Sequence, residues 1–445
     1  MEFRARPFNM EAVFAQKKRK QTKKLRGPDS PLYVSIWPMI YVVRVFGLAP
    51  YDFLQDRLVP SNTYLIFSAT AAMLYTYIFY MVLHGISVDK FFRGAIDGTE
   101  NTKMIINYVV TMYGLGLAVF TRRSFTKTWN ALQDYDEDVR QLSYSRKETQ
   151  TATVAWIVAV ISAVIWIAIN RFGMYAFLET WTYNTGYLII YVGNSIAVYK
   201  FVAMAFFLGQ RFHHLNAMAI KNLPSTSRNK NVITISKTTI LDLHNDLMVA
   251  AENLESIYSW SLLFWLGNLG LHIISNIFHI IVWILESEHQ ETKKPISWLL
   301  VYGFWVLAFL LQLLLLHIAC HYASSQANSI STILMEWQVR VMKRNEYVES
   351  LLQFQNRKLN FSAGGCFYVN LPLLHSVSNK NIMKDIEIFR YGMYFKLCIY
   401  IYIYIYIYIY IYSLNINYLI IKFIFLLIKQ CIQLLQNFSS ILQII

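Results

Sequence analysis

Six stretches of the chain are apolar over about the 20 residues that a helix needs to cross a bilayer. They are Thr63–His84, Met104–Phe120, Thr151–Asn170, Tyr183–Leu208, Ile257–Leu285 and Ile296–Ala319. Backbone polar groups inside hydrocarbon must be bonded internally, so these stretches predict helices. The composition agrees, since 56% of the 445 residues are hydrophobic and only 15% are charged. We therefore predict an all-α, polytopic membrane protein.

Two further apolar segments are less regular. Leu32–Ala49 is short and carries Arg44, which fits a helix lying at the membrane interface better than a span. A seventh candidate span begins at Phe361 and is interrupted after Val377. The sequence thus predicts seven spans, of which the last is truncated or replaced.

The residues after Val377 do not resemble the rest of the chain. Ile399–Tyr412 consists of seven consecutive Ile-Tyr pairs, which ATA and TAT codons would encode from a simple repeat of A and T. Residues 378–445 are dominated by amino acids with such codons, and GTAAGT at Val377-Ser378 would start an intron. We interpret 378–445 as intron read-through forming a low-complexity tail. A genuine β-repeat remains the alternative, because strict alternation suits a strand.

Basic residues are concentrated in alternate loops. The arm of residues 1–30 and the loops after the second, fourth and sixth spans are rich in Lys and Arg. This bias predicts a cytoplasmic N-terminus and an outer end to the seventh span, which is the reverse of a G-protein-coupled receptor. The net charge of +14 is explained in the same way. The Lys17–Lys24 cluster is interpreted as a contact with anionic lipid, and no nucleic acid partner is predicted.

Two helices are expected to leave the membrane on the cytoplasmic side, at about residues 210–256 and 320–360. Each carries an apolar stripe with spacings of three and four, which needs a partner to be buried. We expect the stripes to form an anchor that packs subunits together; a hairpin within one chain is the alternative. The stripe residues are Ile240, Leu243, Leu247, Ala250, Leu254 and Ile257, then Ile330, Ile333, Leu334, Trp337, Val341, Val348, Leu351 and Leu352.

Polar and aromatic residues share one face in each of two neighbouring spans. Polar groups in a bilayer normally face a partner helix or an aqueous cavity, and Tyr and Trp combine apolar area with a hydrogen-bond donor. The two faces predict a pocket for a small organic or sugar-like molecule. Interhelical bonding without a ligand is the alternative. The predicted ligand-binding residues are Tyr183, Tyr187, Tyr191, Asn268, His272, His279 and Trp283.

Catalytic and metal-binding motifs are not seen in the sequence. His272 and His279 are seven residues apart on one helix, and a zinc site needs three or four converging ligands. No nucleophile elbow, phosphate-binding loop or acid pair is present. The sequence predicts neither an enzyme nor a protein with a metal or cofactor.

Three short motifs resemble insect gustatory receptors. Arg211-Phe-His-His-Leu-Asn216 follows the fourth span, Tyr41–Pro50 reads YVVRVFGLAP, and Phe361–Val377 resembles the start of the family's seventh span. The resemblance covers residues 31–377 and agrees with the inverted seven-span topology. The family's Thr-Tyr, five residues, Gln-Phe signature is absent where it should follow. The matching positions are Arg211, Phe212, Leu215, Asn216, Gly365, Phe367, Asn370, Leu373, Leu374 and Ser376.

This resemblance implies a function. Such receptors are ligand-gated, non-selective cation channels that assemble as tetramers with themselves or related receptors in the plasma membrane of sensory neurons. Their ligands are tastants such as sugars, bitter compounds or nutrients, bound in the outer half of each subunit, and the seventh helix lines the pore. An orphan secondary transporter is the main rival, but the internal repeats common in transporters are not seen. A seven-transmembrane signalling receptor is disfavoured by the loop charges.

Overall fold

A computed structural model describes residues 39–54, 57–88, 95–142, 144, 149–177, 181–222, 235–289, 296–341 and 357–371. The predictions for the basic arm at 1–30, for Val348, Leu351 and Leu352, and for Leu373, Leu374 and Ser376 lie outside these residues. So does the predicted read-through tail, and with it the remainder of the seventh span.

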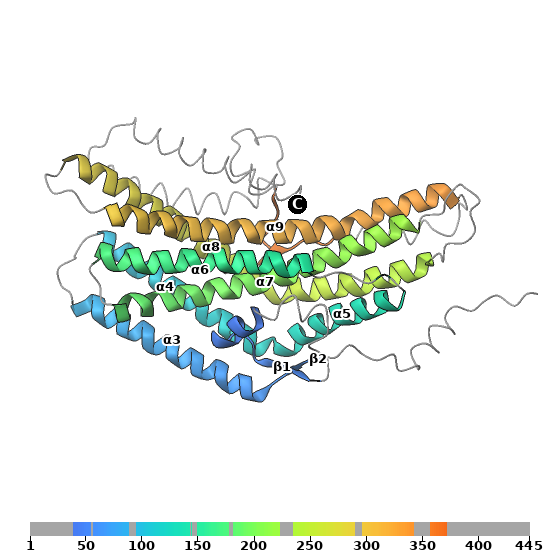
Figure 1. Cartoon of the computed structure of the whole chain (residues 1–445), viewed down its shortest axis with the longest axis horizontal. Helices are drawn as coiled ribbons and strands as arrows, with labels where there is room; N and C mark the ends of the chain where they lie inside the picture. The colour runs from blue at the N-terminus through green and yellow to red at the C-terminus, as the bar shows by residue number, and fades with distance from the viewer. Residues whose placement is uncertain are drawn as a thin grey trace, which may run out of the picture.

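The described chain is a bundle of long helices lying side by side (Figure 1). Their bounds are α3 Asn62–Val88, α4 Ala95–Phe120, α5 Arg122–Gln141, α6 Thr149–Phe177, α7 Trp181–Lys221, α8 Lys237–His289 and α9 Ile296–Val341. All except α5 are long and apolar enough to cross a membrane, which confirms the six predicted spans. The central helix is α7, which packs against α3, α4, α6, α8 and α9.

Helices α3 and α6 form the outer wall of the bundle. Large apolar side chains point away from the protein on both, including Met73 on α3 and Ile167 on α6. Contiguous apolar surface of this kind suits a lipid boundary and not water. The wall therefore agrees with a membrane protein.

Residues after the second span, which we treated as a loop, form helix α5. Its buried positions Phe125, Trp129, Leu132 and Val139 recur at intervals close to the helical period. This face packs on α8. The basic residues that drew attention to the segment lie on its remaining faces, so charge masked an amphipathic pattern that the sequence does contain.

The apolar stripe on α8 is buried inside a single chain. Ile240, Leu247 and Leu254 are almost completely enclosed, because α5, α7 and α9 all pack against α8. On α9, Ile330 and Leu334 are buried as well. The described part of both stripes is therefore covered within the chain, as the hairpin alternative predicts. The side chains of the remaining stripe residues lie outside the described residues, so the anchor between subunits stays a prediction; they are Trp337, Val341, Val348, Leu351 and Leu352.

Two small antiparallel hairpins interrupt the helical architecture. Strands β1 (Tyr51–Leu54) and β2 (Arg57–Pro60) pair near the start of α3. Strands β3 (Ser362–Ala363) and β4 (Phe367–Tyr368) pair after α9. The all-α prediction missed both because each strand is only two to four residues long.

The second hairpin occupies the beginning of the predicted seventh span. Gly364 and Gly365 have φ of +59° and +72°, a left-handed conformation that glycine adopts readily. The hairpin is fixed to α8: the Ser259 hydroxyl donates to the Ser362 carbonyl at 3.0 Å, and the Gly364 N–H donates to the Ser259 carbonyl at 2.9 Å. Family-like residues Gly365 and Phe367 thus belong to a turn that attaches this segment to the bundle.

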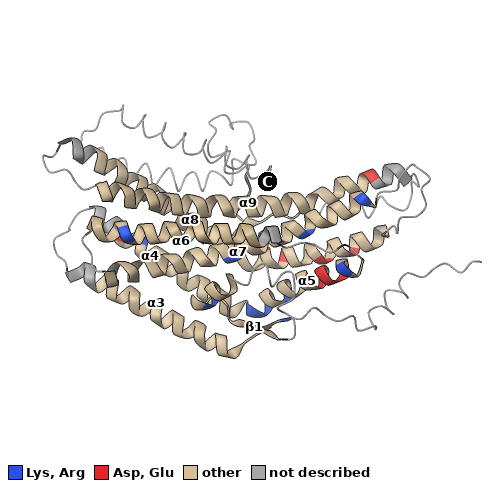
Figure 2. Cartoon of the chain, viewed as in Figure 1, with Lys and Arg blue, Asp and Glu red and all other residues tan. Residues whose placement is uncertain are grey.

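Charged residues gather at the end of the bundle that contains α5 (Figure 2). The fully buried Arg211 of α7 pairs there with Asp136 of α5, with 2.6 Å between Nη2 and Oδ2. Asn216, one turn beyond, donates to the Ser329 hydroxyl of α9 at 2.7 Å. The family-like motif after the fourth span therefore joins α7 to α5 and α9.

Candidate functional site

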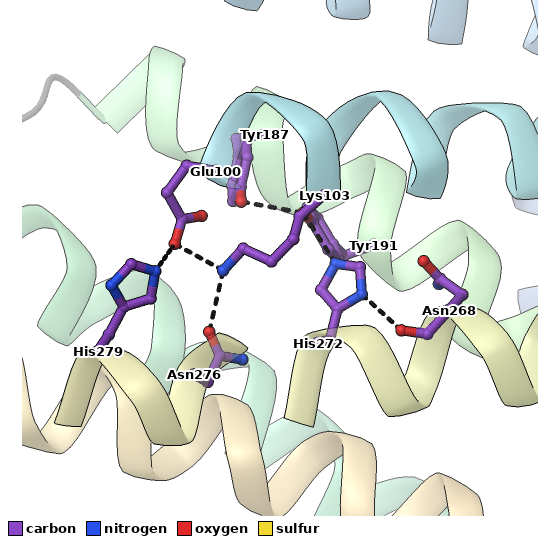
Figure 3. Close-up of polar contacts among 8 residues, drawn as sticks. All are labelled: Glu100, Lys103, Tyr187, Tyr191, Asn268, His272, Asn276 and His279. Carbon is purple, nitrogen blue, oxygen red and sulfur yellow. Dashed lines mark hydrogen bonds and ion pairs between the residues drawn. The ribbon is translucent and has the colours of Figure 1, made fainter. Parts of the chain in front are cut away.

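A cluster of buried polar residues lies at the other end of the bundle, where α4, α7 and α8 meet (Figure 3). Polar side chains point inward from all three helices. They are Glu100, Lys103 and Asn107 on α4, Tyr187, Tyr191 and Asn194 on α7, and Asn268, His272, Asn276 and His279 on α8. We call this set the polar cluster.

A directed chain of hydrogen bonds runs through its centre. His272 Nδ1 lies 2.7 Å from the carbonyl oxygen of Asn268, which can only accept, so Nδ1 carries a proton. In the neutral imidazole, Nε2 then accepts from the Tyr191 hydroxyl, 3.2 Å away. The oxygen of Tyr191 is in turn 3.0 Å from the Tyr187 hydroxyl, which donates to it. The orientation of all three side chains is therefore interdependent.

Asn107 connects the three helices on the side nearer the middle of the bundle. Its Oδ1 accepts from Nδ2 of Asn268 at 3.0 Å and from Nδ2 of Asn194 at 3.2 Å. Besides His279 Nε2, which lies 2.7 Å from Glu100 Oε1, four buried polar atoms of the cluster and its α8 neighbour Ser275 lack a hydrogen-bond partner in the described part of the chain. They are Asn107 Nδ2, Asn194 Oδ1, Asn268 Oδ1 and Ser275 Oγ.

An ion pair lies at the outer edge of the cluster. Lys103 Nζ donates to Glu100 Oε1 at 2.6 Å and to Asn276 Oδ1 at 3.1 Å. His279 Nε2 is 2.7 Å from the same carboxylate oxygen. The Lys103 side chain is 4% exposed and that of Glu100 is 32% exposed. The Lys103 side of the pair is therefore buried, and the Glu100 side is partly exposed.

Aromatic side chains of α9 close the cluster from one side. The Trp305 ring centroid is 4.7 Å from that of Tyr191, and Phe309 is 4.7 Å from the His272 ring. Tyr302 stacks on His279 at 4.8 Å. These rings surround the polar groups with apolar surface, which is the combination found in small-molecule sites.

The structure brings together most of the residues predicted from sequence. Tyr187, Tyr191, Asn268, His272 and His279 all belong to the polar cluster. The side chain of Tyr183 lies outside the described residues. Trp283 lies about one helical turn beyond His279 and makes no direct bond to the cluster through its indole nitrogen, which lacks a partner in the described chain.

Sequence reasoning missed the contributions of α4 and α9. The second span was started at Met104, immediately after the charged residues, whereas α4 begins at Ala95. The spacing of Glu100, Lys103 and Asn107 places them on one helical face, a signal available in the sequence. On α9, Trp298, Tyr302, Trp305 and Phe309 follow the same rule.

The polar cluster is closed in this conformation. Tyr191, Asn268 and His272 are each 1% exposed, so a ligand would enter only if some of these side chains moved. No three His, Cys, Asp or Glu side chains converge on a metal-sized site among the described residues.

A separate cavity of about 30 Å³, with room for about one water molecule, lies near β1 between α5 and α7. It is lined largely by apolar residues and by Lys200, whose Nζ donates to the Leu48 carbonyl at 2.9 Å. The ammonium also lies 4.2 Å from the centre of the Phe125 ring. Lys200 is therefore a buried link between α7 and the chain before α3, and this cavity is distinct from the polar cluster.

The fold and the site together define a class: a helical, multi-span membrane protein with a buried polar and aromatic site between its spans. Comparisons specify the family. Residues 37–378 match the profile of the 7tm chemosensory receptor family. The chain belongs to this family, and is therefore a chemosensory receptor and not an enzyme.

Solved structures show the same fold. The insect olfactory receptor OR5 from Machilis hrabei superposes with a TM-score of 0.58 at 14% identity, covering 79% of this chain and 96% of that one. The same receptor in complex with eugenol superposes with a TM-score of 0.56 at 13% identity and the same coverage. A search of curated protein sequences finds no match.

Proposed function

We propose that this chain is a taste receptor of the insect gustatory type: a ligand-gated, non-selective cation channel opened by a small molecule bound at the polar cluster. Membership of the chemosensory receptor family supports a receptor role. The family-like residues around Arg211 and Gly365 favour the gustatory branch. That a receptor of this fold has been solved in complex with eugenol supports recognition of a small molecule.

The observation that carries the ligand site is the set of unpartnered polar atoms in the polar cluster. An interhelical hydrogen bond in a membrane stabilises by only about 0.6 kcal/mol on average. A buried polar atom without a partner costs about 1–3 kcal/mol. A cluster that served only to join helices would not be expected to retain Asn268 Oδ1 and Ser275 Oγ in that state. A bound molecule with hydrogen-bonding groups would satisfy them.

We place the α5 end of the bundle in the cytoplasm and the polar cluster in the outer half of the membrane. The charged residues at the α5 end (Figure 2) and the basic loops of the sequence support this orientation. The receptor would then lie in the plasma membrane of sensory neurons with a cytoplasmic N-terminus. Protease protection of an N-terminal epitope in sealed vesicles tests it: cleavage from the outside would reverse the assignment.

We further propose that the receptor assembles as a tetramer, with itself or with related receptors. The buried stripes of α8 no longer support this, but another part of α8 offers an outward apolar face: Trp260 is 55% exposed and Phe264 is 40% exposed. Cross-linking of a variant that carries a cysteine at both of these positions should yield dimers to tetramers, because each subunit can then be linked to two neighbours. A monomer only, in native membranes, would contradict it.

The channel function is tested by whole-cell recording. The chain, with the family's Thr-Tyr, five residues, Gln-Phe segment joined at Val377, should give cation currents when sugars, bitter compounds or amino acids are screened. The variant Tyr191→Phe should respond to the same compound at a higher concentration. Saturable uptake without current would favour a transporter. A ligand response that Tyr191→Phe leaves unchanged would place the site elsewhere.

A further inference from the structure

The ion pair of the polar cluster has a zero net charge. Glu100 and Lys103 are three residues apart on α4, and the Lys103 ammonium is almost completely buried. Apart from His272 and His279, the other residues of the polar cluster carry no formal charge: four are amides, namely one on α4, one on α7 and two on α8, and two are tyrosines on α7. The carboxylate and the ammonium thus neutralise each other within the site.

A ligand with a single charge would disturb this balance. Charges in a weakly polar interior are tolerated when paired, and an uncompensated one is strongly unfavourable. An amine entering beside Lys103, or a carboxylate beside Glu100, would leave one excess charge. A neutral molecule with hydroxyl or amide groups would not. It would also find the buried, unpartnered Asn268 Oδ1 and Ser275 Oγ on the same helix as Asn276 and His279.

We propose that Glu100 and Lys103 are specificity-determining residues that restrict the site to ligands of zero net charge carrying hydrogen-bonding groups. The inference rests on the proposed function, since it takes the polar cluster as the ligand site. Removing either charge should change the preferred ligand from a neutral molecule to one whose charge is opposite to the charge that remains. Lys103→Met leaves an excess negative charge and should favour amines. Glu100→Gln leaves an excess positive charge and should favour carboxylates.

The test uses three probes with the same aromatic body: phenylethanol, phenethylamine and phenylacetate. The full chain is placed in lipid nanodiscs, and the probe concentration that half-maximally raises the unfolding temperature is measured. The unaltered protein should prefer phenylethanol. Lys103→Met should prefer phenethylamine, and Glu100→Gln phenylacetate, each by about tenfold or more, as expected for a charge-assisted bond.

The double variant Glu100→Gln/Lys103→Met is the matched control, because it removes both charges and should again prefer the alcohol. The same order of preference in all four proteins, or no stabilisation by any probe, would overturn the proposal. If the single variants do not fold, the unaltered protein decides: stabilisation by a charged probe as strong as by phenylethanol would refute it. Binding is measured here without recording current. If the variants switch their ligand preference but the protein never conducts, this inference holds and the proposed channel function is refuted.

Discussion

Tyr191 of α7 and His272 of α8 share a hydrogen bond of 3.2 Å between the phenol oxygen and Nε2. The two residues are 81 positions apart in the sequence, and their rings meet nearly at right angles. This bond joins the two polar faces that the sequence predicted separately. Removing the Tyr191 hydroxyl therefore tests whether these faces bind a ligand or only pack the helices together.

In the chain with the family's Thr-Tyr, five residues, Gln-Phe segment joined at Val377, Tyr191→Phe should raise the half-maximal ligand concentration without removing the receptor from the cell surface. Loss of one buried hydrogen bond costs about 1–3 kcal/mol, or roughly ten- to a hundredfold in affinity. A truncation to Ala is unsuitable because the ring packs against Trp305. Tyr199→Phe is the matched control, since Tyr199 lies two turns beyond Tyr191 on α7 and its hydroxyl accepts a hydrogen bond from Ser162 of α6 instead. Equal shifts in both variants would indicate a general packing effect.

Asp136→Asn should strongly reduce folding, and Asp134→Asn should not. Asp136 pairs with the fully buried Arg211, and removing one partner of a buried pair costs about 3–5 kcal/mol. Asp134, on the same helix, pairs with Arg57 at the surface, where such pairs contribute about 0–1 kcal/mol. The fraction of protein that elutes as a folded species from detergent extracts measures both. Similar losses would mean that burial of Arg211 does not set the cost.

Gly193→Ala should destabilise the bundle, whereas Gly267→Ala should be tolerated. A Cβ at Gly193 would lie 2.5 Å from the Tyr75 hydroxyl oxygen of α3, and one at Gly267 would meet no atom within 4 Å. The first substitution must move a buried tyrosine. The second should gain up to about 1 kcal/mol of helix propensity. Unfolding temperatures in nanodiscs compare them, and an unaffected Gly193→Ala protein would show that α3 can move away from α7 without cost.

Messenger RNA should contain a further exon joined near Ser376 or Val377 that encodes Thr-Tyr, five residues, Gln-Phe. The family match ends at residue 378, beside the predicted junction, which supports this proposal. The chain as printed should accordingly give no ligand-gated current. Long-read sequencing of transcripts decides: abundant messages that encode Ile399–Tyr412 in frame would refute it, as would robust current from the unrepaired chain.

The helices of the fold could be read from the sequence because membrane spans are a composition signal. Twenty apolar residues predict a helix whatever they pack against. The two hairpins could not be read in this way, since strands of two to four residues carry no periodicity. Helix α5 was hidden for a different reason: its basic residues suggested a loop, although Phe125, Trp129 and Leu132 mark a buried face.

The site was half predictable for a related reason. Tyr187, Tyr191 and His272 are polar exceptions inside apolar runs, so they are conspicuous. Glu100 and Lys103 lie at the end of a span, where charge is ordinary and does not suggest burial. Only the structure shows that α4 carries them into contact with α8. That α8 buries its apolar stripe within one chain likewise depends on tertiary packing.

The continuity of α8 has a mechanical consequence. His272 and Ser259 lie on one uninterrupted helix, separated by about 20 Å at 1.5 Å per residue. Ser259 is the residue that holds the turn around Gly364 by two hydrogen bonds. A twist or tilt of α8 at the level of His272 would therefore be transmitted along the helix backbone to that turn, without side-chain contacts in between.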